Sequence, residues 1–360
     1  MLNAFTLIRG LLGLHSSAID TSFFRLHYKF TVGVLLLFSV LSHSREYFGE
    51  PMDCHFSEYP HGSLNNYCAV QSTFIPVESV KAEESSAMDK DITHPAVVGP
   101  KEKRYYSYYQ WVPVALLIQA MFFYVPWYIW QSLENGRIKM LIGNLTAPVF
   151  RKYDMEEKTE SLLDYVIMNM HNHNSYAYSY FACELLNLTN VMSQIIFMNT
   201  FLGGGLELYG TFLTAFNERS NEEARDPMET VFPTITKCTF RKYGASGDLQ
   251  KLDGFCVLTQ NSGNAKIYTF LWFWFHLLAA ISVLIVMYRV AVIFVPSFRL
   301  HVLRSSSSMN SSRDIEIIDR DLWYGDWFIL RLIGLTVNPI VYKKLMFRLA
   351  RHCEVGLYSG

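Results

Sequence analysis

The sequence lacks an excess of charge of either sign. Its 360 residues carry 31 Lys and Arg against 32 Asp and Glu, and the formal net charge is -1. Proteins that bind nucleic acid concentrate Lys and Arg on one face, so no nucleic-acid partner is expected. The first 27 residues also lack the compact pattern of a cleavable signal peptide, and we expect the first apolar run to act as its own insertion signal.

The patterns of catalytic and metal sites are missing too. There is no short Cys-x-x-Cys pair of a structural zinc site. His171-Asn172-His173 has no further histidine cluster to complete a metal site, so we expect a surface loop there. No repeat relates the two halves of the chain, as a transporter with a midplane site would require. We therefore expect no enzyme, no cofactor and no bound metal.

Apolar residues, in contrast, are abundant. Hydrophobic residues make up 51% and aromatic residues 15% of the chain, more than an ordinary soluble domain carries. Four runs approach the ~20 residues that cross a ~30 Å hydrocarbon core. These predicted transmembrane spans are 28–44, 109–130, 178–202 and 267–295. The fold class is therefore an α-helical integral membrane protein with four transmembrane helices, and Pro113 and Pro126 are expected to kink the second.

Four cysteines indicate which segments lie outside the cell. Cys54 and Cys68 follow the first span, and Cys238 and Cys256 follow the third. Spans one and three cross in the same direction, so both pairs emerge on one side, and four thiols there suit an oxidising exterior. We expect extracellular loops at 45–108 and 203–266, and cytoplasmic segments at 1–27, 131–177 and 296–360.

These four cysteines allow three pairings. The runs 236–240 and 249–258 flank a glycine-containing turn at 242–248, which predicts a β-hairpin with one cysteine on each arm. A bond within the hairpin is allowed. Bonds between the loops would close roughly 180 residues and remove more entropy from the unfolded chain, ~4–5 kcal/mol in the loop-closure model. Cys183 and Cys353 stand apart and are expected to be free thiols.

The third span carries a stripe of polar residues on one helical face: Glu184, Asn187, Asn190 and Gln194. Polar side chains at membrane depth avoid lipid, so the stripe either lines a pore or bonds neighbouring helices. We favour helix packing. In the cytoplasmic segments, Asp154–Met170 and Ile340–Ala350 have the apolar spacing of amphipathic helices.

One pentapeptide points to a family. Tyr108-Tyr109-Gln110-Trp111-Val112 stands at the outer end of the second span and resembles the signature of the innexins, the gap-junction proteins of invertebrates. Further segments look like insect-type innexin sequence in the same order: Phe24–Lys29, Arg225–Met228, Val231–Pro233, Thr236–Phe240 and Gly325–Phe328. The resemblance covers nearly the whole chain.

The resemblance implies a large-pore channel that passes ions and small molecules through gap junctions and non-junctional hemichannels of the plasma membrane. Octamer-like rings of this chain or of other innexins, an apposed ring on the neighbouring cell and membrane lipids are the implied partners. Both termini would be cytoplasmic, beneath a helical dome. The implied disulfides are Cys54–Cys256 and Cys68–Cys238, and the candidates for an N-terminal pore funnel are Leu2, Asn3, Phe5 and Ile8.

Departures from the insect pattern lie in the outer loops. Ala69 stands where a Trp is common, Ala245 where a Pro is common, and the polar segment Thr259–Gly263 where an aliphatic run is common. We expect junctional docking to be retained but altered in partner choice. These loops and the short tail also resemble the virus-borne innexins, or vinnexins. A four-span adhesion or scaffold protein of claudin or tetraspanin type is the alternative, which explains the spans and cysteines but not the pentapeptide.

Overall fold

The computed structural model describes residues 21–48, 52–60, 62–71, 73–76, 103–106, 108–136, 138, 140, 152–204, 231–307 and 310–358. They form two compact units. The first unit contains the described parts of Met1–Gly33, Ala120–Met192 and Leu277–Gly360, and the second unit those of Val34–Gln119 and Ser193–His276. The candidates for a pore funnel, Leu2, Asn3, Phe5 and Ile8, lie outside the described residues.

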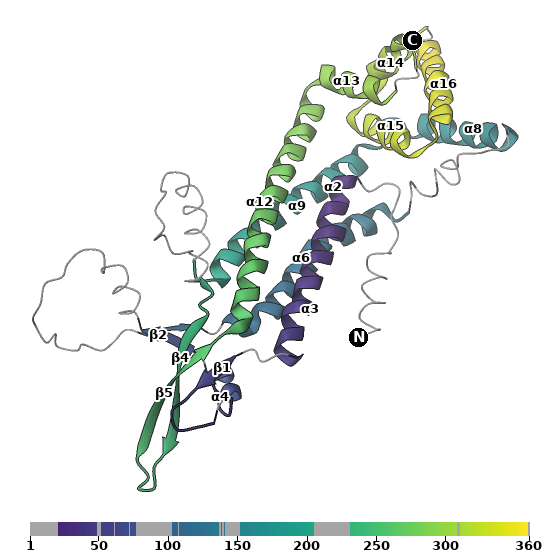
Figure 1. Cartoon of the computed structure of the whole chain (residues 1–360). Coiled ribbons are helices and arrows are strands. Elements are labelled where there is room, and N and C mark those ends of the chain that lie inside the picture. The colour runs from purple at the N-terminus through teal and green to yellow at the C-terminus, as the bar shows by residue number, and fades with distance from the viewer. Residues whose placement is uncertain are drawn as a thin grey trace, which may run out of the picture. The chain divides into compact units, whose positions relative to one another are not determined.

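Within the described residues, four helices are long and apolar enough to cross a membrane, as the sequence predicts (Figure 1). They are Ser22–Ser44, Tyr108–Glu134, Asn174–Phe201 and Thr259–Phe294. Each begins before the predicted start of its span, because hydropathy marks the apolar part of a helix and not its hydrogen-bonded ends. Where the membrane boundaries fall stays a prediction.

Two of these helices are not α-helical throughout. The first consists of α2 (Ser22–Arg25), a π-helical turn η1 (Leu26–Thr31) and α3 (Val32–Phe48). In η1, the hydroxyl of Thr31 donates to the carbonyl of Leu26 at 3.0 Å. The second opens with a 3-10 turn η2 (Tyr108–Trp111) before α6 (Val112–Glu134), whereas α9 (Asn174–Phe201) and α12 (Thr259–Phe294) are regular.

The two prolines of the second span have different places. Pro126 lies inside α6, where it removes a backbone hydrogen bond and a kink is expected. Pro113 lies in the first turn of α6, directly after the 3-10 turn η2, where a proline is tolerated, and the kink expected there stays a prediction. The carbonyl of Pro113 accepts a hydrogen bond of 2.9 Å from the hydroxyl of Ser39 on α3.

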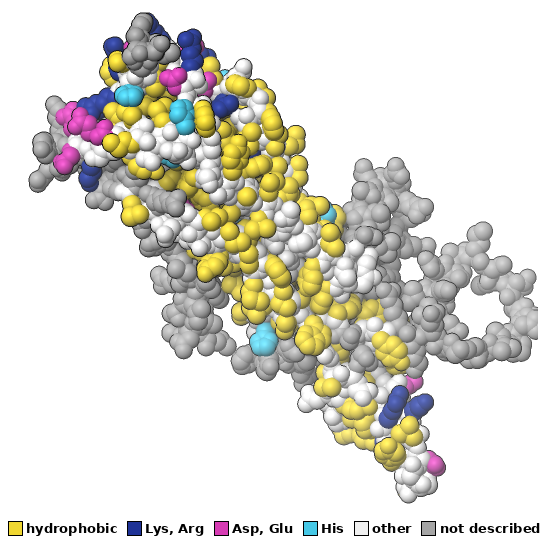
Figure 2. Space-filling model, turned by 180° about the vertical axis from the view of Figure 1, so that it is seen from behind, with side chains coloured by type: hydrophobic (Ala, Val, Ile, Leu, Met, Phe, Trp, Pro, Cys, Tyr) yellow, Lys and Arg dark blue, Asp and Glu magenta, His cyan; other side chains and the backbone are white. Residues whose placement is uncertain are grey.

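The long helices expose apolar side chains. Leu37 of α3, Met121 of α6, Ile196 of α9 and Leu284 of α12 are each more than half exposed. Figure 2 shows hydrophobic side chains covering the long helices on one face, with charged side chains gathered on the C-terminal helices and on the hairpin. Only 22% of the most apolar window of α12 is buried within the chain. This helix therefore requires lipid or neighbouring subunits to cover it.

A small antiparallel sheet forms the strand part of the second unit. Its order is β1-β5-β4-β2-β3. The strands are β1 (Asp53–His55), β2 (Thr73–Pro76), β3 (Lys103–Tyr106), β4 (Ile235–Tyr243) and β5 (Leu249–Val257). The predicted hairpin is confirmed as β4 and β5, and Gly247 in its turn has a φ of +82°, which favours glycine. The short helix α4 (Asn65–Val70) lies between β1 and β2 in the chain.

The rest of the first unit is a layer of shorter helices. They are α8 (Lys152–Met168), α13 (Pro296–Ser306), α14 (Ser312–Asp321), α15 (Tyr324–Thr336) and α16 (Pro339–Tyr358). The amphipathic segments predicted at 154–170 and 340–350 are α8 and most of α16. Their core includes the fully buried Trp327 and Ile333 of α15 and Leu345 of α16, so α15 lies in the centre of this layer.

Gly325 is where α15 approaches the loop before α9 most closely. A Cβ atom built on Gly325 would lie 2.3 Å from both the backbone nitrogen of Asn174 and the carbonyl carbon of His173. Both atoms belong to the main chain and cannot rotate away, so only glycine fits at this position.

We therefore expect Gly325→Ala to destabilise the protein by about 2–4 kcal/mol, since it forces the helix and the loop apart. Thermal unfolding of the detergent-solubilised protein measures the effect. Gly334→Ala in the same helix is the control, because the atoms nearest to its added methyl group belong to the ring of Tyr342, a side chain that can shift where a main chain cannot. Equal losses for the two variants would contradict the close backbone approach.

Candidate functional site

The pentapeptide at residues 108–112 is a junction between the second span and the two segments predicted to be extracellular. Tyr109 and Val112 are buried, whereas Trp111 is 61% exposed. The amide of Gln110 donates to the carbonyl of Ala69 in α4. The ring of Tyr108 packs edge-on against Phe201 at the end of α9 and against Phe232 before β4. The pentapeptide therefore fixes both outer segments to the second span.

Two disulfides hold the sheet of the second unit. Cys54 of β1 is bonded to Cys256 of β5, and Cys68 of α4 is bonded to Cys238 of β4. This is the pairing that the family resemblance implied, and it excludes a bond within the hairpin. Each bond joins a segment before the second span to one after the third, 202 and 170 residues apart. All four cysteines are buried and make up half of the buried residues of this small core.

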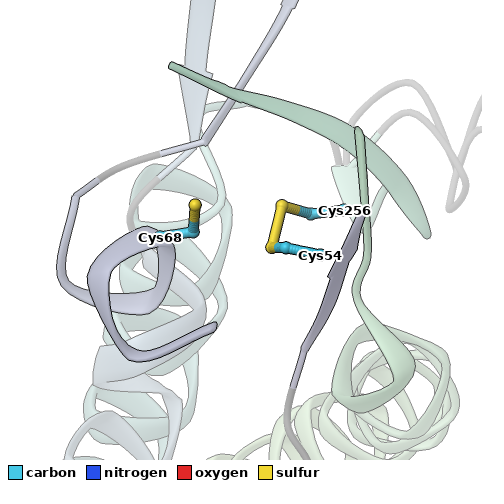
Figure 3. Close-up of side chains that lie close together, drawn as sticks. All are labelled: Cys54, Cys68 and Cys256. Atoms are coloured by element: carbon cyan, nitrogen blue, oxygen red, sulfur yellow. A yellow bond between two sulfur atoms is a disulfide. The ribbon is translucent and has the colours of Figure 1, made fainter. Parts of the chain in front are cut away.

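The cysteine sulfurs also lie close enough together to resemble a metal site. Those of Cys54, Cys68 and Cys256 lie within 4.8 Å of one another. Figure 3 shows Cys54 bonded to Cys256 and the sulfur of Cys68 nearby. Because Cys68 is itself bonded to Cys238, no thiolate of this cluster is free to bind a metal ion.

Aromatic and charged contacts support the sheet beside the disulfides. The rings of Tyr59 and Tyr67 pack edge-on against Phe240 of β4. The ammonium group of Lys242 lies 2.6 Å from the carboxylate of Glu58, and this hydrogen bond raises the pKa of Lys242. Both charged groups face solvent, so the pair positions the hairpin arm more than it stabilises the fold.

The polar stripe of α9 contains an ion pair. The carboxylate of Glu184 accepts two hydrogen bonds from the guanidinium of Arg289 on α12, at 2.7 and 2.8 Å. Both side chains are buried, as are Asn187 and Gln194, while Asn190 is half-buried. The Arg289 guanidinium also lies 5.3 Å from the ring centre of Phe328. Glu184 thus bonds one spanning helix to another, in agreement with the helix-packing interpretation of this residue.

Arg289 was not foreseen as the partner of Glu184. The sequence shows it as an isolated charge near the end of the fourth span, 105 residues beyond Glu184. The sequence did contain a signal for this pair. Glu184 and Arg289 are a carboxylate and a guanidinium within predicted spans, and a charged side chain within a membrane usually pairs with an opposite charge. Which helices meet is decided only by the tertiary structure.

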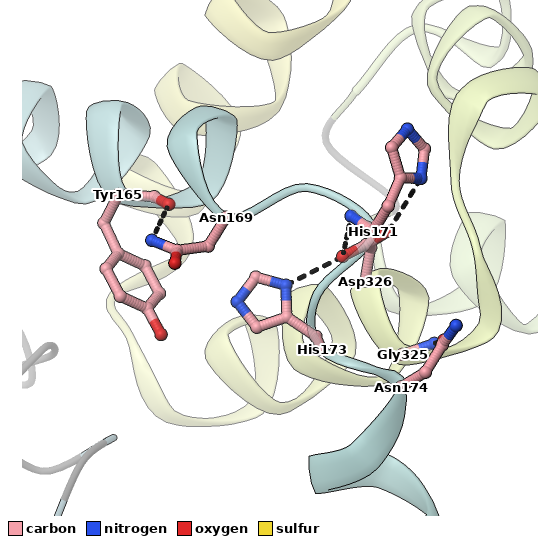
Figure 4. A network of polar contacts seen from close by, with 7 residues as sticks. All are labelled: Tyr165, Asn169, His171, His173, Asn174, Gly325 and Asp326. Atoms are coloured by element: carbon pink, nitrogen blue, oxygen red, sulfur yellow. Dashed lines mark hydrogen bonds and ion pairs between the residues drawn. The ribbon is translucent and has the colours of Figure 1, made fainter.

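A second buried carboxylate, Asp326, organises the loop before α9 (Figure 4). It accepts hydrogen bonds from the backbone N–H of His171, at 3.0 and 3.1 Å, and lies 2.7 Å from Nδ1 of His173. The side chain of Asn174 accepts a hydrogen bond of 2.8 Å from the backbone N–H of Gly325. These contacts fix the first turn of α15 to the loop.

The expectation of a surface loop at His171-Asn172-His173 is therefore wrong for one of its histidines. His171 is 45% exposed, but the side chain of His173 is only 7% exposed. His173 is buried because Asp326, distant by 153 residues in the chain, provides a partner for its ring nitrogen. The two histidines converge on a carboxylate and have a structural role in this layer.

Known proteins resemble the chain over nearly its full length. The family model described as Innexin matches residues 20–353. Innexin inx2 of Schistocerca americana is 42% identical over 358 residues, which cover 98% of this chain and 99% of that protein. Innexin inx2 of Drosophila melanogaster is 41% identical over 364 residues, which cover 100% of this chain and 98% of that protein. Innexin shaking-B of the same species is 38% identical over 355 residues, which cover 97% of this chain and 94% of that protein.

Removal of the Cys68–Cys238 bond tests its contribution to stability. The double variant Cys68→Ser/Cys238→Ser leaves no unpaired thiol from this bond. We expect a loss of about 3–4 kcal/mol, since with Cys54–Cys256 intact the bond closes a loop of about 30 residues. Thermal unfolding without reductant measures it. Cys183→Ser/Cys353→Ser is the matched control, because both thiols are free and burial raises the pKa of Cys353 to about 11. A similar loss in the control would show that lost sulfur packing, and not the bond, is responsible.

The Glu184–Arg289 pair is tested by a double-mutant cycle. Glu184→Gln and Arg289→Gln each leave one buried charge unpaired, and we expect a loss of about 3–5 kcal/mol from each. The double variant should lose clearly less than the sum of the two. Glu316→Gln removes the exposed partner of Arg304 and should cost under about 1 kcal/mol. If Glu184→Gln assembles normally but changes ion selectivity, the stripe lines the pore and the packing interpretation is wrong.

Proposed function

Because the chain belongs to the innexin family, whose members are gap-junction channel subunits, we propose that it forms membrane rings that dock to rings of the neighbouring cell. The same rings, when undocked, act as hemichannels. Family membership indicates a channel protein and not an enzyme, and it leaves the adhesion alternative without support. The observation that carries the proposal is the similarity across the whole chain, combined with four apolar helices.

Ring assembly is supported by the uncovered helix surface. A single chain leaves large apolar side chains of all four spanning helices exposed, and α12 is the least covered of them. Lipid can cover one side of such a helix, and neighbouring subunits the other. We propose an octamer-like ring of this chain, alone or with other innexins. Leu2, Asn3, Phe5 and Ile8 remain our candidates for its constriction.

The proposed topology follows from the order of the spans and the disulfides. The segments joined by the two disulfides lie between spans one and two and between spans three and four, so an alternating path puts them on one side. Disulfides persist in oxidising surroundings, which makes this side extracellular. Both termini, and helices α13 to α16, are then cytoplasmic.

The docking surface that we propose is the tip of the β4–β5 hairpin. Tyr243 is 79% exposed and Leu249 49% exposed, and they face each other across the strand ends. The divergent Ala245 lies in the turn between them and is exposed. In contrast, Thr259–Gly263, expected to be part of the outer loop, forms the first turns of α12, where Asn261 donates to the carbonyl of Pro233 at 2.8 Å. We therefore assign altered partner choice to the hairpin tip.

Paired-cell recording tests the proposed function. Communication-deficient cells that express the chain are recorded in pairs and singly, and we expect junctional conductance in pairs and membrane current or dye uptake in single cells. Membrane current without coupling would mean that the hemichannel does not dock to itself. Silence in both, with the protein at the cell surface, would contradict a homomeric channel.

Variants of the hairpin tip separate docking from pore formation. We expect Tyr243→Ser/Leu249→Ser to lower junctional conductance severalfold while leaving the single-cell current unchanged, because it removes apolar contact area only at the tip. Ile235→Ser is the matched control, since Ile235 is 64% exposed at the other end of β4. Equal effects of the two changes on coupling would rule out the tip as the docking surface.

A further inference from the structure

A cavity of about 160 Å³ opens among helices of the first unit. It is lined by Phe23 of α2, Glu184 of α9, Arg289 of α12 and Arg331 of α15. Phe23 lies at the start of the first candidate span and Arg289 near the end of the fourth, and an even number of crossings puts those two positions on the same side. The cavity therefore lies at the membrane surface that faces the C-terminal helices.

Among the described residues that line this cavity, positive charges outnumber negative ones. Glu184 is fully engaged by Arg289, which leaves the guanidinium of Arg331 as a second positive charge in the lining. Among the described residues, Arg331 forms no ion pair. It is held between the rings of Tyr288 and Trp327, at 5.2 and 5.5 Å from their centres. Burial lowers the pKa of Arg331, so the site would gain from an anion beside it.

Two donor atoms at this position have no acceptor. Within the described part of the chain, Nε of Arg331 and the hydroxyl of Tyr288 are buried without a hydrogen-bond partner. Both residues line the cavity. Buried donors are nearly always satisfied in folded proteins, so an acceptor that enters this cavity would satisfy both.

Apart from Thr21, whose hydroxyl contacts Tyr180 and caps α2, the remaining described lining is apolar and reaches the outside of the helices. Ile285 of α12 and Leu332 and Leu335 of α15 contribute to it, and Leu335 is 65% exposed. Helix α15 is largely apolar, but its 13 residues are too few to cross a bilayer. Most of α15 is buried in the core of the first unit, but its C-terminal end with Leu335 is exposed. The apolar side of the cavity is therefore open and suits a hydrocarbon chain better than a soluble metabolite.

We propose that this cavity binds an anionic phospholipid of the leaflet that faces the C-terminal helices. The phosphate accepts hydrogen bonds from Nε of Arg331 and from the hydroxyl of Tyr288, and the first part of an acyl chain lies along Leu332 and Leu335. The volume is below the 300–1,000 Å³ typical of small-molecule pockets, so the rest of the lipid stays in the bilayer. The bound lipid would join α12 to α15. This site is additional to the channel function proposed above.

Lipid retention by the full-length oligomer tests the site. The protein is purified from vesicles that contain phosphatidylserine and phosphatidylcholine in equal amounts, and native mass spectrometry counts the lipids that each subunit keeps. We expect the wild type to prefer phosphatidylserine. Arg331→Gln should weaken that binding by about tenfold, which is the loss expected when a charged hydrogen bond to a phosphate is removed. Tyr288→Phe, which deletes only the hydroxyl, should weaken it less.

The control is Arg313→Gln, which removes the same charge from an 81% exposed position on α14 and should leave lipid retention unchanged. An equal loss in this control, or no preference for phosphatidylserine in the wild type, would overturn the proposal. So would inorganic phosphate alone raising the unfolding temperature as much as the lipid does, because the site would then be a plain anion site. If Arg331→Gln does not assemble, Tyr288→Phe decides, and unchanged lipid retention in that variant rejects the site. None of these measurements depends on junctional conductance.

Discussion

The absence of water from the bilayer core is the constraint on which the rest of this structure depends. Backbone donors and acceptors there must pair within the chain, and four long helices meet that requirement. The same constraint acts on side chains. Glu184 and Arg289 would each be costly alone, and together they form a bidentate pair that joins α9 to α12. Apolar side chains, in contrast, can remain exposed along the helices, and this leaves surface for lipid and for other subunits.

The second unit needs another source of stability for its sheet, because the sheet is small and few apolar side chains are buried in its core. Five short strands come from segments that are far apart in the chain, and hydrogen bonds between such strands do not hold a sheet by themselves. Two buried disulfides and the rings packed on Phe240 take the place of a larger core. The signature residues Tyr108 and Gln110 bind this sheet region to the second span. A rigid surface of this kind suits the docking between rings that we propose.

The first unit combines a large aromatic and aliphatic core with a few buried polar contacts that set its geometry. Trp327 and its neighbours supply most of the burial, whereas Asp326 and Gly325 determine how α15 meets the loop before α9. The cavity beside Arg331 lies in the same unit, where α12 meets α15. A lipid bound there would contact both a spanning helix and the C-terminal layer, and so would give the membrane a direct influence on how the two pack.

The sequence alone determined the four spans, the hairpin, the helical segments α8 and α16, and the family, because each depends on local hydropathy, turn residues or a short contiguous motif. The tertiary structure decided the rest. It decided that Arg289 is the partner of Glu184 and that Asp326 is the partner of His173. It also decided that the hairpin cysteines bond to the first cysteine pair and not to each other. All of these contacts join residues from distant parts of the chain. The π-helical turn at Leu26–Thr31 was likewise not predictable from the sequence. Local patterns record what each segment prefers, but a buried charge, a close glycine or a disulfide depends on which segments the folded chain brings together.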